Sequence, residues 1–351
     1  MLLIVAVMAM SLGCRAVPRS EQSRGTGLAG NYANLTGTLN GAGSSFQAPF
    51  QEEAIDQLRE PAPNLTVNYQ GGGSGKGKQA LADKVVDFAG TDSLVKDEEK
   101  AKYKGGPMLY FPVVAAPITV AYNLEGIDLL QMSPATLAGV FQGEIDRWND
   151  PAIRADNPGV TLPDKAITVA HRSDGSGTTS NFTKYMKTAA GALWRLDAGD
   201  TVKWPSGTQG GNGNAGVSQI IKNNPGSIGY VDYADAQATG LLAVAVQNST
   251  GAYVRPTIAG TQAAVEAAAV KDDLTVNALN VDAAEAYPIT AMTYVLVYRQ
   301  QPDASQGALL RGYVQYLLTD AQQFAEKVDF APLPPSLRDR AVAQLSLLEI
   351  T

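Results

Sequence analysis

Hydrophobic and polar positions follow two different periods along the chain. Short apolar runs typical of buried strands alternate with longer stretches whose apolar residues recur at the spacing of an amphipathic helix. The strand-type runs are Thr66–Tyr69, Val85–Ala89, Leu109–Ala115, Ile118–Tyr122, Ile167–His171, Ile228–Val231 and Thr293–Tyr298. The helix-type stretches are Phe50–Leu58, Ser180–Ala189, Val217–Asn223, Gln262–Val270 and Leu309–Lys327. This alternation predicts an α/β fold.

The N-terminus predicts export. The apolar run Met1–Met10 is followed by Ser11-Leu12-Gly13 and the only cysteine, Cys14, which resembles the lipidation signal of bacterial lipoproteins. A membrane-spanning helix needs about 20 residues, so this run is too short to be one. We therefore predict a signal peptide over residues 1–14 with lipidation at Cys14, a plain export signal and a buried helix being the alternatives. Residues 15–36 are rich in Gly, Ser, Asn and Arg and predict a tether.

Length and charge narrow the class of protein. At 351 residues the chain exceeds what one hydrophobic core usually serves, so two domains are predicted. Its 27 basic and 34 acidic side chains give a formal charge of -7, which argues against a nucleic-acid partner. A single cysteine and a single histidine, His171, exclude an intramolecular disulfide and the usual Cys/His zinc sites. No metal and no cofactor are predicted.

Glycine-rich segments stand at three places where a strand or loop gives way to a helix. The first two are Gly41-Ala42-Gly43-Ser44-Ser45-Phe46-Gln47-Ala48-Pro49 and Tyr69-Gln70-Gly71-Gly72-Gly73-Ser74-Gly75-Lys76-Gly77-Lys78. Glycines let an oxyanion approach the backbone, and the N–H groups of a helix start favour negative charge. A nucleotide P-loop would need Ser or Thr at Gln79, and a hydrolase elbow would need Gly at Lys76. A capped helix start without a ligand is the alternative for the first segment, and a flexible surface loop is the alternative for the second.

The third segment adds a permanent positive charge. It reads His171-Arg172-Ser173-Asp174-Gly175-Ser176-Gly177-Thr178-Thr179 between a strand-type run and a helix-type stretch. The planar guanidinium of Arg172 suits two oxygens of one anion, and Asp174 is placed to hold Arg172. Ser176, Thr178 and the backbone N–H groups from Gly177 onward add donors at the helix start. A capped turn with an exposed Arg–Asp pair is the alternative.

These segments together resemble the periplasmic phosphate-binding proteins of bacterial ABC phosphate transporters. The resemblance runs from about Leu39 to Leu333. Besides the three segments, it is carried by Asn68, Val86-Asp87-Phe88-Ala89-Gly90-Thr91-Asp92, Phe141-Gln142-Gly143-Glu144-Ile145 with Trp148-Asn149, Val202-Lys203-Trp204-Pro205, Pro225-Gly226-Ser227-Ile228-Gly229-Tyr230-Val231 and Tyr287-Pro288-Ile289-Thr290.

The resemblance also implies which residues bind phosphate. The donors it implies are Ser45, Phe46 through its backbone N–H, Ser74, Arg172, Ser176, Gly177 and Thr178. Asp92 would accept the proton of the bound phosphate, and Asp174 would support Arg172. A carboxylate beside an oxyanion is repulsive unless a proton lies between them, so Asp92 disfavours sulfate, which carries no proton at neutral pH. The role of Lys76 stays open.

The fold that the resemblance implies is a two-lobed periplasmic binding protein of type II. Two α/β domains would be joined by a two-strand hinge with the ligand cleft between them. Residues 37–118 and 289–351 would form the first domain, and residues 119–288 the second. The expected partners are inorganic phosphate and a membrane ABC permease. The protein is expected to be a monomer without enzymatic activity, in the periplasm or lipid-anchored on the outer face of a membrane.

Three other functions remain open from the sequence. A binding protein for another oxyanion, such as sulfate or molybdate, would share the fold and the donors. A phosphatase or serine hydrolase would need a base beside its nucleophile, and His171 is the only imidazole in the chain. An adhesion or signalling protein would keep the cleft without using it.

Overall fold

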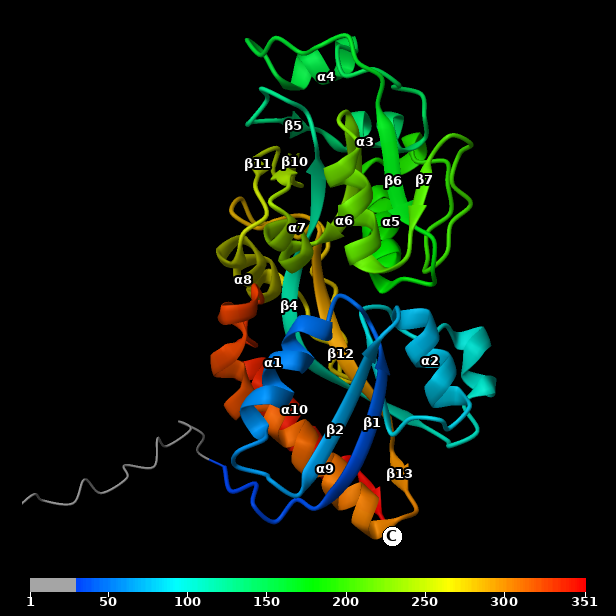
Figure 1. Ribbon diagram of the computed structural model, residues 1–351, viewed down its shortest axis with the longest axis vertical. Helices are drawn as coiled ribbons and strands as arrows, with labels where there is room; N and C mark the ends of the chain where they lie inside the picture. Colours follow the sequence, from blue (N-terminus) through cyan, green and yellow to red (C-terminus); the bar gives the residue numbers. More distant parts are fainter. Residues whose placement is uncertain (1–29) are drawn as a thin grey trace, which may run out of the picture.

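One long strand, β4 (Met108–Tyr122), runs through both halves of the molecule. In the computed structural model, which describes residues 30–351, β4 pairs with β12 (Thr290–Tyr298) as far as Pro117 and with β8 (Ser227–Asp232) from Ile118 onward. Each half of β4 therefore belongs to a different lobe. Figure 1 shows β4 running from one lobe into the other, with β12 beside the part of β4 that lies in the lobe of β1 and β2.

The strands form one sheet of nine among the described residues, in the order β2-β1-β3-β12-β4-β8-β6-β7 with β9 paired to β4. We call β2, β1, β3, β12 and residues 108–117 of β4, with α1, α2, α9 and α10 that pack on them, the first lobe, and the rest of this sheet with its helices the second lobe. The remaining bounds in this sheet are β1 (Gly37–Gly43), β2 (Leu65–Gly71), β3 (Phe88–Thr91), β6 (Thr168–Arg172), β7 (Gln209–Gly211) and β9 (Leu242–Ala243). Smaller pairings join β5 (Gln131–Met132), β10 (Ala245–Gln247) and β11 (Tyr253–Val254), and β13 (Gln300–Gln301) with β14 (Glu349–Ile350).

Helices cover the sheet in both lobes (Figure 1). The α-helices are α1 (Ala48–Leu58), α2 (Ser74–Ala82), α3 (Pro134–Phe141), α4 (Pro151–Asp156), α5 (Gly177–Ala189), α6 (Gly213–Asn223), α7 (Tyr233–Thr239), α8 (Ile258–Ala267), α9 (Ala304–Leu318) and α10 (Pro335–Gln344). Short 3-10 turns cover Asp97–Lys102, Gly191–Leu193, Asp320–Phe324, Glu326–Val328 and Leu345–Leu347. No helix within residues 30–351 is both long and apolar enough to cross a bilayer.

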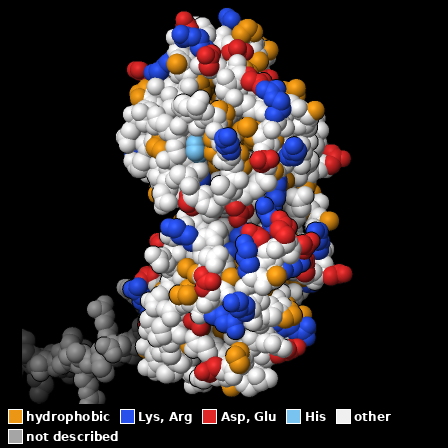
Figure 2. All heavy atoms as spheres, turned by 90° about the vertical axis from the view of Figure 1, so that its right-hand side faces the viewer, with side chains coloured by type: hydrophobic (Ala, Val, Ile, Leu, Met, Phe, Trp, Pro, Cys, Tyr) orange, Lys and Arg blue, Asp and Glu red, His pale blue; other side chains and the backbone are white. Residues whose placement is uncertain are grey.

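The core of the first lobe has two sides because successive strand residues point to opposite faces of a sheet. Phe88 and Val295 belong to the large apolar cluster that also contains residues of α1 and α9. Their neighbours Ala89 and Leu296 face the other way and pack with Leu81 of α2. The central strands β3 and β12 of the first lobe are therefore buried on both faces. Figure 2 shows the two lobes meeting at a narrow waist.

Several elements differ from those that the sequence pattern predicts. The two predicted runs on either side of Pro117 form one strand, because the ladder continues past the proline through the bond from Ile118 N to Ile289 O (2.8 Å). The predicted helix Leu309–Lys327 ends at Leu318 and continues as 3-10 turns. The sequence pattern did not predict β1, because glycine and asparagine, which make up most of this segment, are depleted in strands.

The described part of the predicted tether packs on the first lobe. Tyr32 is buried, its ring meets Tyr316 edge-on at 5.2 Å, and its hydroxyl donates to Asp320 Oδ2 at 2.5 Å. Residues 30–36 are therefore attached to α9 and the turn that follows it. The predicted lipidation site, Cys14, lies outside the described residues.

Candidate anion-binding site

The N-termini of three helices meet between the lobes. α1 and α2 come from the first lobe and α5 from the second. Gly75 N donates to Gly175 O at 2.9 Å across the gap. A Cβ built on Gly177 would lie 2.5 Å from Ser74 Oγ and 2.6 Å from Asp92 Oδ2. The backbone N–H groups and dipoles of these helix starts therefore face one small region, the arrangement that attracts an anion.

Asp92 lies at the centre of this region, just after β3. Its side chain is 5% exposed and receives three hydroxyl groups. Ser44 Oγ lies 2.6 Å from Oδ1 and 2.8 Å from Oδ2, Thr293 Oγ1 lies 2.7 Å from Oδ1, and Ser74 Oγ lies 3.2 Å from Oδ2. Asn181 of α5 donates to the backbone carbonyl of Asp92 at 2.6 Å. The second lobe thus holds the acidic residue from the opposite side.

Burial and hydrogen bonds act on Asp92 in opposite directions. Burial raises the pKa of the Asp92 carboxyl above its usual value, while donors from Ser44, Thr293 and Ser74 and the charge of Arg172 lower it. The net pKa shift is upward, so the carboxyl holds a proton more readily than an exposed aspartate. A ligand that brings its own proton relieves this cost, because the carboxylate then accepts a hydrogen bond.

Arg172 supplies the positive charge from the end of β6. Its side chain is 1% exposed and forms a two-pronged ion pair with Asp174, Nε to Oδ1 at 2.8 Å and Nη2 to Oδ2 at 2.5 Å. Its Nη1 donates to Asn214 Oδ1 at 3.1 Å and to Thr178 Oγ1 at 3.4 Å. Burial raises the pKa of Asp174, but the bonds and charge of Arg172 outweigh it and lower that pKa overall. Asp174 therefore holds the guanidinium in place.

The other predicted donors line the same region. Ser45 is half-buried and receives Asn214 Nδ2 at 3.4 Å from the second lobe. The ring of Phe46 packs edge-on against Phe330 at 5.6 Å, so only the backbone of Phe46 is available to a ligand. Thr178 and Ser176 are fully buried at the start of α5, and Ser176 caps the helix by accepting from Thr179 N at 3.1 Å.

Several residues at the site were not predicted from the sequence. Ser44 could have been suspected, since it neighbours Ser45 in the same glycine-rich segment. The sequence alone does not show which of the two serines contacts Asp92 and which faces a ligand. Asn214 follows the strand β7 in a Gly/Asn-rich stretch that resembles an ordinary turn. Thr293 and Asn181 had no signal, because they lie inside a strand and a helix that the apolar pattern explains fully.

The only histidine is occupied elsewhere. His171 Nδ1 lies 2.9 Å from Arg172 O and Nε2 lies 3.1 Å from Thr208 Oγ1. Its ring stacks on Trp204 at 5.0 Å, and burial lowers its pKa. None of these contacts brings the imidazole to a serine or threonine hydroxyl of the cleft, so the described residues do not pair it with a nucleophile there.

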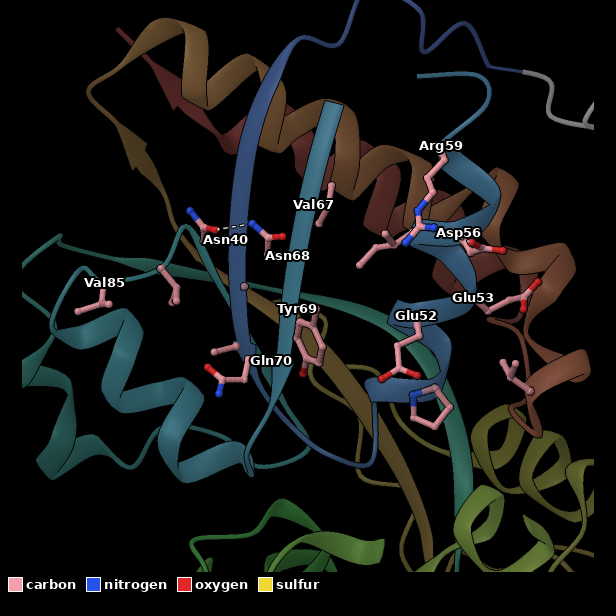
Figure 3. Close-up of a pocket in the computed structure, with 16 residues that line it drawn as sticks. Asn40, Glu52, Glu53, Asp56, Arg59, Val67, Asn68, Tyr69, Gln70 and Val85 are labelled. Atoms are coloured by element: carbon pink, nitrogen blue, oxygen red, sulfur yellow. Dashed lines mark hydrogen bonds and ion pairs between the residues drawn. The ribbon is translucent and has the colours of Figure 1, made fainter. Parts of the chain in front are cut away.

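A hollow of about 910 Å³ lies on the first lobe, away from the cleft (Figure 3). It borders the open edge of β2, where Asn68 donates to Asn40 at 2.9 Å, and the outer face of α1. Glu52, Glu53 and Asp56 of α1 line it. Arg59 also lines the hollow, but it pairs with Asp56 (Nη1 to Oδ1, 3.3 Å), so three carboxylates against one guanidinium leave a net negative charge that repels an anion.

Comparisons with known proteins identify the family of this chain. A family model described as a PBP superfamily domain matches residues 25–321. The phosphate-binding protein PstS of Pasteurella multocida is 34% identical over 315 residues, which cover 88% of this chain and 89% of that protein. PstS3 of Mycobacterium bovis is 34% identical over 313 residues, which cover 86% and 84%. The chain belongs to the PstS family of phosphate-binding proteins.

Solved structures support the fold of this PstS-family chain. A periplasmic phosphate-binding protein called PfluDING, solved with bound phosphate, matches with a TM-score of 0.74 at 22% identity, over 90% of this chain and 96% of that chain. A phosphate-binding protein from Stenotrophomonas maltophilia matches with a TM-score of 0.70 at 21% identity, over 88% and 94%. The predicted two-lobed periplasmic binding fold is confirmed.

Proposed function

We propose that this PstS-family chain captures inorganic phosphate in the cleft between its lobes and performs no chemistry on it. The observation that carries the proposal is a buried acceptor, Asp92, among donors from three helix starts and the guanidinium of Arg172. A protonated phosphate satisfies both kinds of group at once, since its oxygens accept and its hydroxyl donates. The relatives' names as phosphate-binding proteins support the same ligand.

The ligand contacts that we propose follow the predicted residues. Ser45, the N–H of Phe46 and Ser74 would donate from the first lobe. Arg172 and the start of α5 would donate from the second, with Ser176, Gly177 and Thr178 at that helix start. Asp92 would accept the ligand's proton. Charge-assisted hydrogen bonds contribute about 1.5 to 3 kcal/mol each when bulk water is excluded, so closure of the lobes matters for affinity.

The domain boundaries that we propose follow the change of partner in β4. Residues 37–118 and 289–351 would form one domain and residues 119–288 the other, with β4 and the start of β12 as the hinge. A hinge of this kind lets the two lobes close on a ligand. The closed form would then deliver phosphate to a membrane ABC permease, with the protein acting as an exported monomer that is lipid-anchored through Cys14.

Calorimetric titration of the mature protein, residues 15–351, with phosphate, arsenate and sulfate tests the proposal. We expect phosphate to bind tightly, arsenate to compete with it, and sulfate to bind weaker by about 10⁴-fold or more. Equal binding of phosphate and sulfate would overturn the proton-acceptor role of Asp92. Absence of binding to all three ions would overturn the proposed function, and release of a product from a phosphate ester would show that the protein is an enzyme.

A further inference from the structure

A buried chain of hydrogen bonds runs from α9 to Asp92. Tyr313 donates its hydroxyl to Gln51 Oε1 at 2.5 Å, and Gln51 Nε2 donates to Gln47 Oε1 at 3.0 Å. Gln47 Nε2 then donates to Thr293 Oγ1 at 2.9 Å, and Thr293 donates to Asp92 Oδ1 at 2.7 Å. The first four side chains are fully buried and Asp92 is 5% exposed. Such a chain specifies the direction of each donor because no water can replace a partner.

The direction of this chain is fixed at Gln47. Its Nε2 also donates to the carbonyl of Tyr294 at 3.2 Å, and a carbonyl oxygen can only accept. The nitrogen of the amide must therefore face Thr293, whose oxygen receives this N–H. The proton of the Thr293 hydroxyl is then left to point at Asp92 Oδ1 at 2.7 Å, a much shorter contact than the 3.4 Å to the Thr91 carbonyl.

Gln47 also fixes the direction of a second hydroxyl, that of Ser44. The backbone N–H of Gln47 donates to Ser44 Oγ at 3.1 Å, so the proton of Ser44 is also free to point at the carboxyl of Asp92. Ser74 is set independently of Gln47, since its Oγ accepts from Asp92 N at 3.2 Å. Two of the three hydroxyls around Asp92 thus take their direction from Gln47.

We infer that Gln47 is a positioning residue for anion selection, which turns the hydroxyls of Ser44 and Thr293 toward Asp92 and so keeps that carboxyl a hydrogen-bond acceptor. The inference rests on the proposed function. The donors on Oδ1, together with those that Ser44 and Ser74 give to Oδ2, favour the charged carboxylate over the acid, so Asp92 meets the ligand as an acceptor. The proton between them must then come from the ligand, which phosphate supplies and sulfate does not.

Removal of the Gln47 amide would relax this constraint. The Thr293 hydroxyl would then no longer be fixed as a hydrogen-bond donor to Asp92 and could accept a hydrogen bond from the protonated carboxyl, and loss of a donor to the charged form raises the pKa of a carboxyl. The titratable and charged groups that face Asp92 are Arg172 of β6, Tyr69 of β2 and Tyr294 of β12. Burial raises the pKa of both phenols, so they stay neutral, and Arg172 is held by Asp174. Asp92 is therefore the group whose protonation would change.

The test compares Gln47→Met with Gln344→Met in the mature protein. Gln344 of α10 is a matched control, because it is a buried glutamine of the first lobe that donates to the Tyr110 carbonyl at 2.7 Å without contacting the Gln47 chain. Phosphate and sulfate affinities are measured by calorimetry between about pH 5 and pH 8, in two buffers of different ionisation enthalpy to count protons. For Gln47→Met we expect selectivity for phosphate over sulfate to fall at least about tenfold on acidification, with about one proton taken up per sulfate bound.

Gln344→Met should keep the selectivity and the proton count of the wild type at every pH. If Gln47→Met does not fold, Thr293→Val removes the last donor of the chain with little change of shape and should show the same pH-dependent loss. One outcome would overturn the role of Gln47 and leave the proposed function intact: the wild type binds phosphate, and Gln47→Met has the same selectivity and proton count as Gln344→Met. Failure of the wild type to bind phosphate would instead overturn the proposed function.

Discussion

Lys78 of α2 forms an ion pair with Asp200 of the second lobe, with Nζ 2.7 Å from Oδ2. Ser93 of the first lobe donates to the same carboxylate oxygen at 3.0 Å. The side chain of Lys78 is 8% exposed and that of Asp200 is 21% exposed. The ion pair lies beside the hydrogen bond from Gly75 N to Gly175 O. Two groups of the first lobe therefore hold one carboxylate of the second at the edge of the cleft.

The Lys78 ion pair should slow the release of phosphate. In Lys78→Met the aliphatic stem remains but Asp200 loses its counter-charge, so the closed form is weakened. We expect the dissociation rate, measured by stopped flow, to rise about tenfold or more while association changes less. Lys76→Met is the matched control, because Lys76 is exposed and has no ion pair among the described residues. Equal dissociation rates in the two variants would contradict the role of Lys78.

Arg172 should contribute far more to affinity than the nearby Lys76. Arg172→Ala removes the main positive charge of the cleft and leaves Asp174 buried without its partner. Loss of one member of such a buried charged pair costs about 2 to 5 kcal/mol, so phosphate affinity should fall about 30-fold or more. Lys76→Ala should change the Kd less than about threefold. Calorimetric titration checks both values, and a larger effect for Lys76 would show that the counter-charge of the anion is misassigned.

Asp92→Asn should weaken discrimination against sulfate. Donors from Ser44 and Thr293 would hold the amide oxygen, so the amide nitrogen would take the place of Oδ2 and donate to a proton-free anion. We expect the ratio of sulfate to phosphate dissociation constants to fall by about a hundredfold or more. Competition titrations measure this ratio, with Asp164→Asn on the surface as control. Unchanged selectivity in Asp92→Asn would discard the proton-acceptor role.

Gly177→Ala should block the close approach of the lobes. The added methyl carbon would lie 2.5 Å from Ser74 Oγ and 2.6 Å from Asp92 Oδ2, well inside contact distance. We expect phosphate affinity to fall at least about tenfold with little change in the thermal stability of the ligand-free protein. Gly72→Ala is the control, since its added carbon would meet only the flexible stem of Lys76 at 3.2 Å. A Gly177→Ala protein with wild-type affinity would show that phosphate binding does not depend on the close approach of Gly177 to Ser74 and Asp92.

The candidate site was predictable where its residues follow one another in the chain. Arg172, Asp174 and the start of α5 lie within a single turn, so local rules of helix capping and ion pairing suffice to group them. Asp92 could be singled out because it follows an apolar run. Its role as proton acceptor came only from the resemblance of the chain to a known family. The partners of Asp92 were mostly missed, since Thr293 comes from a strand 201 residues further along.

Periodicity and composition by themselves determined that the chain is an α/β protein with glycine-rich helix starts suited to an anion. Both properties depend on near neighbours, because strand alternation, helix period and helix dipoles act over a few residues. Only the tertiary structure brought Gln47 to Thr293, 246 residues away, and Asn214 to Ser45, 169 residues away. A buried hydrogen bond between such residues leaves no periodic trace in the sequence, because its cost and its gain arise only after the chain has folded around it.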